Sequence, residues 1–209
     1  MKKYIDIQNW KRKEYYEFFS KYDEPFWGIV SEIDCTIAFQ KAKEGNSSFF
    51  LYYLYKSTQA INMIEEFKYR IENEKIVLFD LINSATTLGR DDETFGYSFI
   101  NFSSDFNNFS QNGEKEIERV KNSTGLSLNE NSNRLDVIHY SSLPWTKFTG
   151  LTQARNFKEI DSIPKIIFGK YFVVDGKKIM NVSLNAHHGL ADGLHAAKYF
   201  ELFQKLMNE

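Results

Sequence analysis

The segment NAHHGLADGLH, residues 185–195, places three of the chain's four histidines within nine positions. A β-prone run precedes the histidines (178–185) and an apolar, helix-like run follows them (194–207), so the segment predicts a turn between a strand and the final helix. Turns of this kind hold reactive groups on a rigid scaffold and leave them accessible. Adjacent strand residues point to opposite faces, so His187 and His188 cannot serve one site equally. We therefore expect one histidine to be catalytic and the other structural.

Two other interpretations of this cluster stay open from the residues alone. His188, Asp192 and His195 would share a face if the segment were helical, and imidazole with carboxylate suits zinc. However, Gly189 and Gly193 would each weaken such a helix by about 1 kcal/mol, and there is no glutamate as in HExxH sites. We therefore expect no metal. A purely structural role for all three histidines is the remaining alternative.

Outside this segment, helical and β-prone runs follow one another irregularly. Apolar periodicity predicts helices at 11–22, 48–67, 114–120 and 194–207, and strands at 26–36, 69–71, 75–79, 84–88, 95–102, 135–140, 165–174 and 178–185. Residues 122–134 are the most turn-prone and predict a loop. The order lacks regular βαβ alternation. It therefore predicts an α/β (α+β) fold, a two-layer sandwich with a mixed sheet and packed helices, in a single domain of residues 1–209.

Composition narrows the classes of function. The formal net charge is -2, so no overall basic field exists to hold nucleic acid. No run approaches the roughly 18 apolar residues that cross a bilayer, and we expect no membrane association. Cys35 is the single cysteine and cannot form an internal disulfide, and the N-terminal MKKYIDIQNW has no apolar signal core. These features predict a cytoplasmic protein. Cys35 also falls in an expected strand, where it is a poor nucleophile.

Several motifs resemble the chloramphenicol acetyltransferases of the type A class, whose signature is His-His-x-x-x-Asp-Gly before the C-terminal helix. The chain carries HHGLADG at 187–193, SSLPW at 141–145 followed by FTG at 148–150, and GKY at 169–171. WKRKE at 10–14, ID at 33–34 and ETF at 93–95 also fall at family-like places, so the resemblance covers nearly the whole chain. Dihydrolipoyl acyltransferase catalytic domains have a related histidine signature, but they usually carry lipoyl and linker segments upstream.

This resemblance implies a fold, an activity and an assembly. The fold would be the two-layer sandwich of coenzyme A-dependent acyltransferases. The activity would be direct transfer of an acetyl group from acetyl-CoA to the hydroxyl of a small-molecule acceptor such as chloramphenicol, which inactivates that antibiotic, with no acyl-enzyme and no metal. The assembly would be a homotrimer with active sites between neighbouring subunits, each built from one subunit's N-terminal segment and the histidine of the next.

The resemblance also assigns catalytic and supporting residues. His188 is the expected general base, because imidazole is available in its neutral form at cellular pH. Ser141 matches the serine that stabilises the tetrahedral oxyanion, although from the residues alone it reads as a turn serine before Pro144. Asp192 is expected to pair with Arg12 and to brace the histidine loop.

Coenzyme A contacts are expected at Lys170, Tyr171 and Trp145, where a cation meets phosphate and rings stack on adenine or line the channel. Each of these three has an alternative interpretation. Lys170 and Tyr171 could be ordinary residues of a strand edge, and Trp145 could be a core tryptophan.

The expected acceptor pocket departs from the family pattern. Phe18, Phe19 and Trp27 keep its aromatic character, with Pro25 between them in place of a cysteine. Beyond Gly150, polar side chains replace the usual apolar ones. Gln153 and Arg155 would make this wall of the acceptor pocket polar. Ile167 replaces a threonine of the family, and Asn185 replaces a glutamine. They predict an acceptor more polar than chloramphenicol. The competing functions are a binding or regulatory protein that has lost acyl transfer, and a metal-dependent hydrolase.

Overall fold

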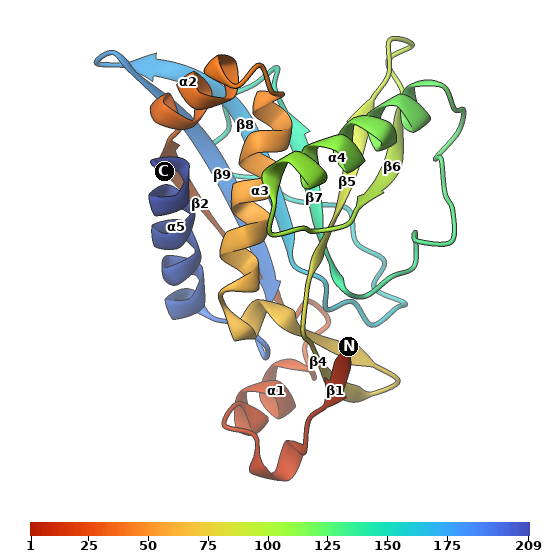
Figure 1. Cartoon of the computed structure of the whole chain (residues 1–209). Helices are drawn as coiled ribbons and strands as arrows, with labels where there is room; N and C mark the ends of the chain where they lie inside the picture. The colour runs from red at the N-terminus through yellow and green to blue at the C-terminus, as the bar shows by residue number, and fades with distance from the viewer.

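A six-stranded sheet forms the centre of the molecule in the computed structural model, which describes residues 1–209 (Figure 1). Its strand order is β2-β9-β8-β7-β5-β6. The β5–β7 and β7–β8 pairs are parallel and the others antiparallel, so the sheet is mixed. The strands are β2 (Phe26–Asp34), β5 (Asn83–Gly89), β6 (Phe95–Ile100), β7 (Val137–Leu143), β8 (Lys165–Val174) and β9 (Lys177–His187).

Four helices cover one face of this sheet (Figure 1). They are α2 (Thr36–Glu44), α3 (Phe49–Asn62), α4 (Phe106–Lys121) and α5 (Gly193–Met207). A core of 29 buried residues lies between the helices and the sheet. Alternate strand residues such as Ile138, Ile166 and Leu184 point into this core. This arrangement confirms the predicted two-layer α/β sandwich.

The opposite face of the sheet carries no helix, and the strand residues between the core positions point to it. Register aligns them in two rows across the sheet. One row runs through Ala85, His139, Lys165 and Asn185, and the other contains Ser141, Ile167 and Ser183. We call this surface the open face. It is rich in polar side chains, which suits a face left partly accessible to water.

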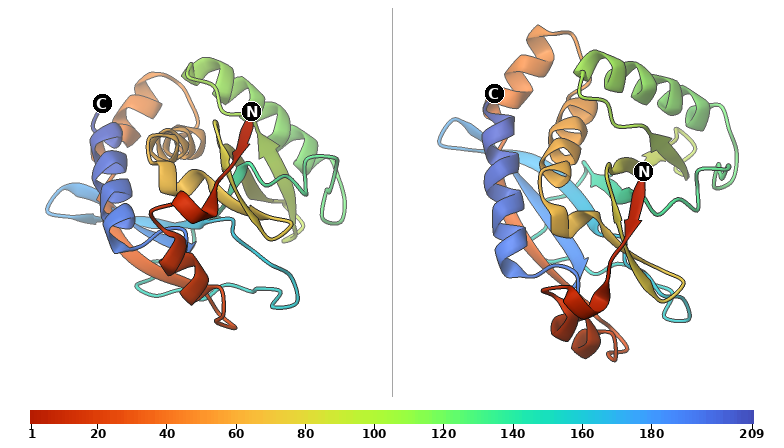
Figure 2. Two further views of the ribbon diagram at one scale, coloured as in Figure 1. Left: turned by 90° about the horizontal axis from the view of Figure 1, so that it is seen from below. Right: turned by 60° about the horizontal axis from the view of Figure 1, so that its bottom comes forward.

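A second, three-stranded sheet with the order β1-β4-β3 lies near the N-terminus. Its strands are β1 (Lys2–Tyr4), β3 (Tyr69–Glu72) and β4 (Lys75–Phe79), and helix α1 (Lys13–Phe19) follows β1 along the chain. Figure 2 shows α1 at the end of the main sheet where β9 runs into α5. Sequence-distant segments therefore meet at the histidine turn.

Most predicted elements are present, but several differ from the prediction, among them α3, which ends at Asn62 instead of residue 67. Helix α1 is shorter than the expected 11–22, α4 begins well before residue 114, and β1 and α2 were not predicted. Strand β2 ends at Asp34, and Cys35 precedes α2 instead of lying in the strand. Burial raises the pKa of the Cys35 thiol to about 12, so it is unreactive at neutral pH. Ser48 caps α3, accepting a hydrogen bond from the Leu51 N–H at 3.4 Å.

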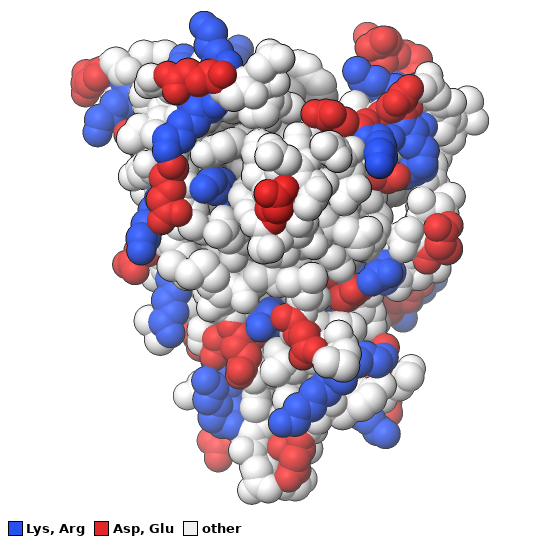
Figure 3. Space-filling model, in the orientation of Figure 1, with Lys and Arg blue, Asp and Glu red and all other residues white.

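The surface carries charges of both signs. Figure 3 shows acidic and basic side chains intermixed over the helical face, with no large area of one sign. None of the helices is long and apolar enough to span a bilayer.

Candidate active site

His187 is the last residue of β9 and holds the turn that follows it. Its carbonyl accepts hydrogen bonds from the N–H groups of Leu190 and Ala191 at 2.9 and 3.0 Å. Its Nδ1 accepts a third from the Gly189 N–H at 3.1 Å. The ring is only 3% exposed, and burial lowers its pKa to about 4, helped by the cation of Arg155. A neutral ring can act as this acceptor, so His187 organises the turn.

His188 projects from the turn with one ring nitrogen accessible. Its ring stacks on Phe19 with centroids 4.0 Å apart and planes 7° apart, and it lies 5.5 Å from the Trp27 ring. Its backbone N–H donates to the Pro25 carbonyl at 2.8 Å. Nδ1 is buried without a hydrogen-bond partner, whereas Nε2 is not among the buried atoms. The imidazole is therefore fixed by stacking and offers Nε2 to an incoming group.

Gly189 permits the close approach of helix α1 to this turn. A Cβ on Gly189 would lie 2.9 Å from the Tyr16 Cα and 3.1 Å from the His187 ring. Any larger residue would push α1, and with it Phe19, away from His188.

Arg12 braces the turn from the N-terminal segment. Its side chain is 6% exposed and pairs with Asp192 through Nη1 and Oδ2 at 2.9 Å. Two further hydrogen bonds of 3.3 Å run to the carbonyls of His188 and Gly189. Partial burial raises the pKa of Asp192, but the Arg12 hydrogen bond and nearby cations outweigh it, so the net pKa lies below the usual value. Asp192 is therefore a carboxylate at neutral pH.

Asp192 also begins helix α5. Its Oδ1 accepts the Leu194 N–H at 3.2 Å, and the His195 Nδ1 accepts the Asp192 N–H at 3.1 Å, forming a capping box. On its other side His195 Nε2 lies 3.3 Å from the Glu66 carboxylate. His195 thus links the turn to the segment after α3. No group of three or more His, Cys, Asp or Glu side chains is arranged to hold a metal ion.

We predict that Arg12→Met lowers the free energy of unfolding by about 3 to 5 kcal/mol, because it leaves Asp192 and two carbonyls without a partner. Urea unfolding followed by circular dichroism measures this. Lys13→Met is the matched control, because Lys13 lies one residue away, and its only ion pair is a long one to Glu17 at 3.9 Å. Equal stabilities of the two variants would show that the brace contributes little.

Ser141 lies on the open face, inside β7 and not in a turn, which removes the turn interpretation. Its hydroxyl shares a hydrogen bond of 2.9 Å with that of Thr87. It faces a cavity of about 340 Å³, which we call the open-face cavity. The walls come from the two rows of the open face, from β6 and from two loops; they include Tyr97, Phe99, Leu128, Asn129, His139, Gln153, Lys165 and Ile167.

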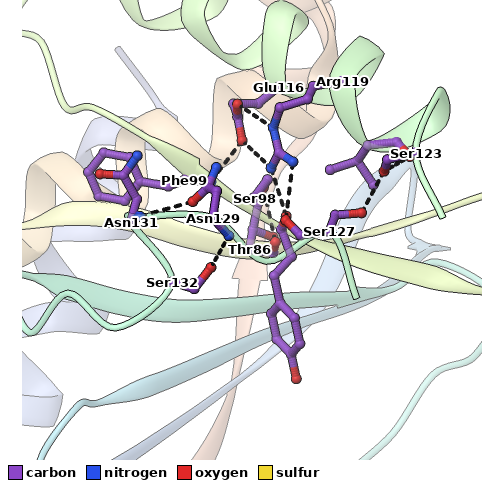
Figure 4. Close-up of polar contacts among 12 residues, drawn as sticks. Thr86, Ser98, Phe99, Glu116, Arg119, Ser123, Ser127, Asn129, Asn131 and Ser132 are labelled. Carbon is purple, nitrogen blue, oxygen red and sulfur yellow. Dashed lines mark hydrogen bonds and ion pairs between the residues drawn. The ribbon is translucent and has the colours of Figure 1, made fainter. Parts of the chain in front are cut away.

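The loop at 122–134 forms the outer wall of this cavity, and a polar network fixes it (Figure 4). Arg119 donates to the Ser127 carbonyl at 3.1 Å and to the Tyr97 carbonyl at 2.9 Å. Arg119 is itself paired with Glu116, whose carboxylate also accepts the Phe99 N–H at 3.0 Å. The expected loop is therefore present, and it is an ordered wall.

Within one chain, the cavity and the accessible histidine are far apart. Ser141 pairs with Ile167 and Ile167 with Ser183, so Ser141 lies two strands from β9. His188 lies five residues beyond Ser183 along the chain. With about 3.3 Å per residue and about 4.8 Å between strands, the two side chains are separated by roughly 15 to 20 Å. One chain does not bring them to the same reacting carbonyl.

The expected acceptor residues divide between these two places. Phe19 and Trp27 surround His188 of their own chain, and the exposed Phe18 packs on Phe19. Gln153 lines the open-face cavity. Arg155 does not line it. Its guanidinium lies 3.5 Å over the Phe26 ring and pairs with Glu24, and its side chain lines a separate, smaller hollow that His187 also lines. Ile167 and Asn185 both lie on the open face, Ile167 in the cavity wall.

The expected coenzyme A residues lie along β8 and just beyond the end of β7, and Tyr171 packs on the helical side of the sheet. Trp145 is 76% exposed and is not a core residue. The Lys170 N–H donates to the Thr146 carbonyl at 2.9 Å, and Lys170 is exposed at an irregularity in β8. Tyr171 is half-buried, with its ring 5.4 Å from that of Phe39 and the Lys178 amine 4.7 Å above it. Lys170 and Trp145 are accessible to a ligand, whereas Tyr171 is largely engaged in packing.

Two features of the site had no motif in the sequence. His139 lies in the middle of a β-prone run and gives no signal that it faces a cavity. The one available signal is its position two residues before Ser141, because residues two apart in a strand point to the same face. The role of residues 127–132 as a cavity wall depends on Arg119 and Arg90, which are distant in sequence.

Comparisons with known proteins agree over the whole chain. The family model for chloramphenicol acetyltransferase matches residues 2–204. A chloramphenicol acetyltransferase of Campylobacter coli is 29% identical over 209 residues, covering 98% of both chains. A solved chloramphenicol acetyltransferase structure superposes with a TM-score of 0.92 at 30% identity, covering 99% of this chain and 100% of that one. A probable dihydrolipoamide acetyltransferase of Listeria monocytogenes, 13% identical with a TM-score of 0.66 over 93% of this chain and 88% of that one, shares the fold.

Proposed function

Because the chain belongs to the chloramphenicol acetyltransferase family and is an acyltransferase of that family, we propose that it moves an acetyl group from acetyl-CoA to a hydroxyl of a small acceptor. The observation that supports this most directly is His188, with one accessible ring nitrogen on a turn braced by Arg12. A thiol-release assay with acetyl-CoA and a panel of alcohols including chloramphenicol tests it. Release of coenzyme A thiol at the same rate with and without every alcohol of the panel would contradict transfer to an acceptor.

The proposed reaction is direct. His188 Nε2 takes the proton of the acceptor hydroxyl as its oxygen attacks the thioester carbonyl. The carbonyl π electrons move to oxygen, and the Ser141 hydroxyl donates a hydrogen bond to this oxyanion. Collapse of the intermediate breaks the carbon–sulfur bond. The thiolate of coenzyme A then receives the proton from His188, which is neutral again at the end of the cycle.

Supporting residues hold these groups in place. Phe19 stacking and the Arg12–Asp192 pair fix the ring and the turn of His188. Lys170 and Trp145, both exposed, would contact the coenzyme, with Lys170 facing a phosphate. Cys35 is buried and its pKa is raised, so its thiol is not available to form an acyl-enzyme. We propose that the protein is located in the cytoplasm.

We propose a homotrimer whose active sites lie between subunits. The separation of His188 from Ser141 within one chain supports a site that takes its base from one subunit and its open-face cavity from the next. The resemblance implied that the N-terminal segment meets the histidine of the next subunit, and for the aromatic residues this expectation is wrong. Phe19 and Trp27 contact His188 of their own chain, so they belong to the histidine side of the proposed interface.

Light scattering is expected to give about three times 24.6 kDa. His188→Ala and Ser141→Ala subunits, each with about 1% of wild-type activity or less when alone, should regain roughly a quarter of it when unfolded together and refolded at equal amounts, since that share of interfaces would pair an intact histidine with an intact serine. Each variant refolded alone is the control. An active monomer, or no recovery in the mixture, would contradict the shared site.

Chloramphenicol is the acceptor that we propose to be tested first. We expect its acetylation with a Michaelis constant about ten- to a hundredfold above that of the Campylobacter coli relative assayed in parallel, because Gln153 presents a polar group to the ligand. Steady-state kinetics at saturating acetyl-CoA measures this. Equal constants for the two enzymes would show that Gln153 is accommodated. A more polar alcohol is the second candidate acceptor.

A further inference from the structure

The Ser141 hydroxyl has a single hydrogen-bond partner within the chain. That partner is the Thr87 hydroxyl on the neighbouring strand β5, 2.9 Å away. Neither hydroxyl makes another hydrogen bond, and both residues line the open-face cavity. A hydroxyl carries one hydrogen, so one of the two hydrogens lies between the oxygens and the other is free to point into the cavity.

The proposed chemistry determines which hydrogen has to be free. When Ser141 donates to Thr87, its hydrogen is engaged and cannot reach the oxyanion. When Thr87 donates to Ser141, the Ser141 hydrogen is free, and the Ser141 O–H becomes a stronger donor because its oxygen accepts a hydrogen bond. Neither hydroxyl gives up its proton in this second arrangement. Stabilisation of the oxyanion by Ser141 therefore needs Thr87 as the donor of the pair.

The strands around Thr87 fix its backbone. Thr87 is paired with Tyr97 of β6, whose carbonyl accepts a hydrogen bond from Arg119 at 2.9 Å. The Ser98 hydroxyl donates to the Thr86 carbonyl at 2.9 Å, which ties β6 to β5 (Figure 4). Threonine is also branched at Cβ, and this branching restricts χ1. The direction of the Thr87 hydroxyl is therefore set by the scaffold before a substrate binds.

We propose that Thr87 is a positioning residue for acetyl transfer: its hydroxyl donates to Ser141 Oγ and directs the Ser141 hydrogen toward the oxyanion. This rests on the proposed function, because it takes Ser141 as the oxyanion donor. Thr87 acts only through Ser141 and contacts no reacting atom. Its contribution should therefore appear in the transition state and disappear when Ser141 loses its hydroxyl.

Thr87→Val keeps the shape of the side chain and removes the hydroxyl. With the alcohol of the panel that the wild-type protein acetylates fastest, we expect kcat to fall about five- to tenfold, the effect of one lost hydrogen bond. The KM values for the alcohol and for acetyl-CoA should stay within about twofold, because ground-state binding does not use this hydrogen bond.

Two further variants control for the shape and the fold. Thr87→Ser restores the hydroxyl and should bring kcat back to within about threefold of the wild-type value. Thr124→Val, at an exposed threonine outside the cavity wall, is the matched control and should keep the wild-type kcat. Thermal unfolding by circular dichroism shows whether each variant is folded.

The double variant separates positioning from other roles. Thr87→Val combined with Ser141→Ala should have a kcat within about twofold of that of Ser141→Ala, because no serine hydroxyl is left to direct. A further loss of about five- to tenfold in the double variant would show that Thr87 acts independently of Ser141. A larger loss in Thr87→Val than in Ser141→Ala would make Thr87 itself the oxyanion donor. Either result would overturn the proposal.

Failure of the proposed function gives a different result. If the wild-type protein acetylates no alcohol of the panel, the proposed function and this inference fail together. If transfer occurs and Ser141→Ala keeps the wild-type kcat, the assignment of Ser141 fails, and the role of Thr87 fails with it. If Ser141→Ala is slow while Thr87→Val keeps the wild-type kcat, or if Thr87→Ser recovers nothing, the inference fails alone.

Discussion

His188→Ala is expected to lower kcat for acetyl transfer at least a thousandfold while the protein stays folded. Removal of a general base typically costs two to four orders of magnitude, and here the same group would also return the proton to the coenzyme A thiolate. The ring is partly exposed and makes no side-chain hydrogen bond within the chain, so its removal should cost little stability. Thiol release and thermal unfolding by circular dichroism measure the two effects.

His187→Ala provides the contrasting variant. His187 accepts the Gly189 N–H inside the turn and is buried, so its loss should lower stability and displace His188. Asparagine at 187 can retain an acceptor and should recover part of the activity. If both alanine variants were folded and equally inactive, the division into a catalytic and a structural histidine would be wrong.

Ser141→Ala is expected to lower kcat roughly a hundredfold with an unchanged dissociation constant for acetyl-CoA. A donor to a developing oxyanion contributes to the transition state and little to the ground state, so KM should change far less than kcat. Single-turnover kinetics and calorimetric binding of acetyl-CoA separate the two.

Ser142→Ala is the control for this prediction. Ser142 is the next residue in β7, and its hydroxyl shares a hydrogen bond with Tyr53 at 3.0 Å instead of lining the open-face cavity. It should lose some stability and keep most of the turnover. A wild-type rate for Ser141→Ala would leave the oxyanion without an assigned donor from this strand.

Strongly patterned elements were predictable from the sequence. Strand β8 was expected at its observed bounds, and β9 and α5 within two residues at each end, because long apolar runs and a turn between them define all three. Helix α2 was missed because the alternation of β2 was extended through Cys35 into residue 36. The first half of α4, FNNFSQNG, contains weak helix formers and is held by the Asp105 cap and by packing.

The site was predictable in part, and the limit has a physical cause. The resemblance suggested a partner for Asp192, and the structure contains the Arg12–Asp192 contact. The resemblance could not place Arg155, because its contacts with Glu24 and Phe26 depend on how the loop between β7 and β8 folds back on β2. Nor could it find His139, since an isolated histidine in a strand has no motif. Contacts between separate subunits are not encoded in the pattern of one chain's elements.

The network around Arg119 has a consequence for how copies of this protein meet. Strand β6 is the last strand of the main sheet, and an edge strand with unpaired backbone groups can recruit another chain. Here the outward N–H of Tyr97 donates to the Leu126 carbonyl at 2.9 Å, and the Tyr97 carbonyl accepts a hydrogen bond from Arg119. The Phe99 N–H donates to the Glu116 carboxylate. At these positions the edge has no backbone groups free for continuous β-pairing with another chain. The loop at 122–134, which forms the outer wall of the cavity, therefore also prevents edge-to-edge aggregation.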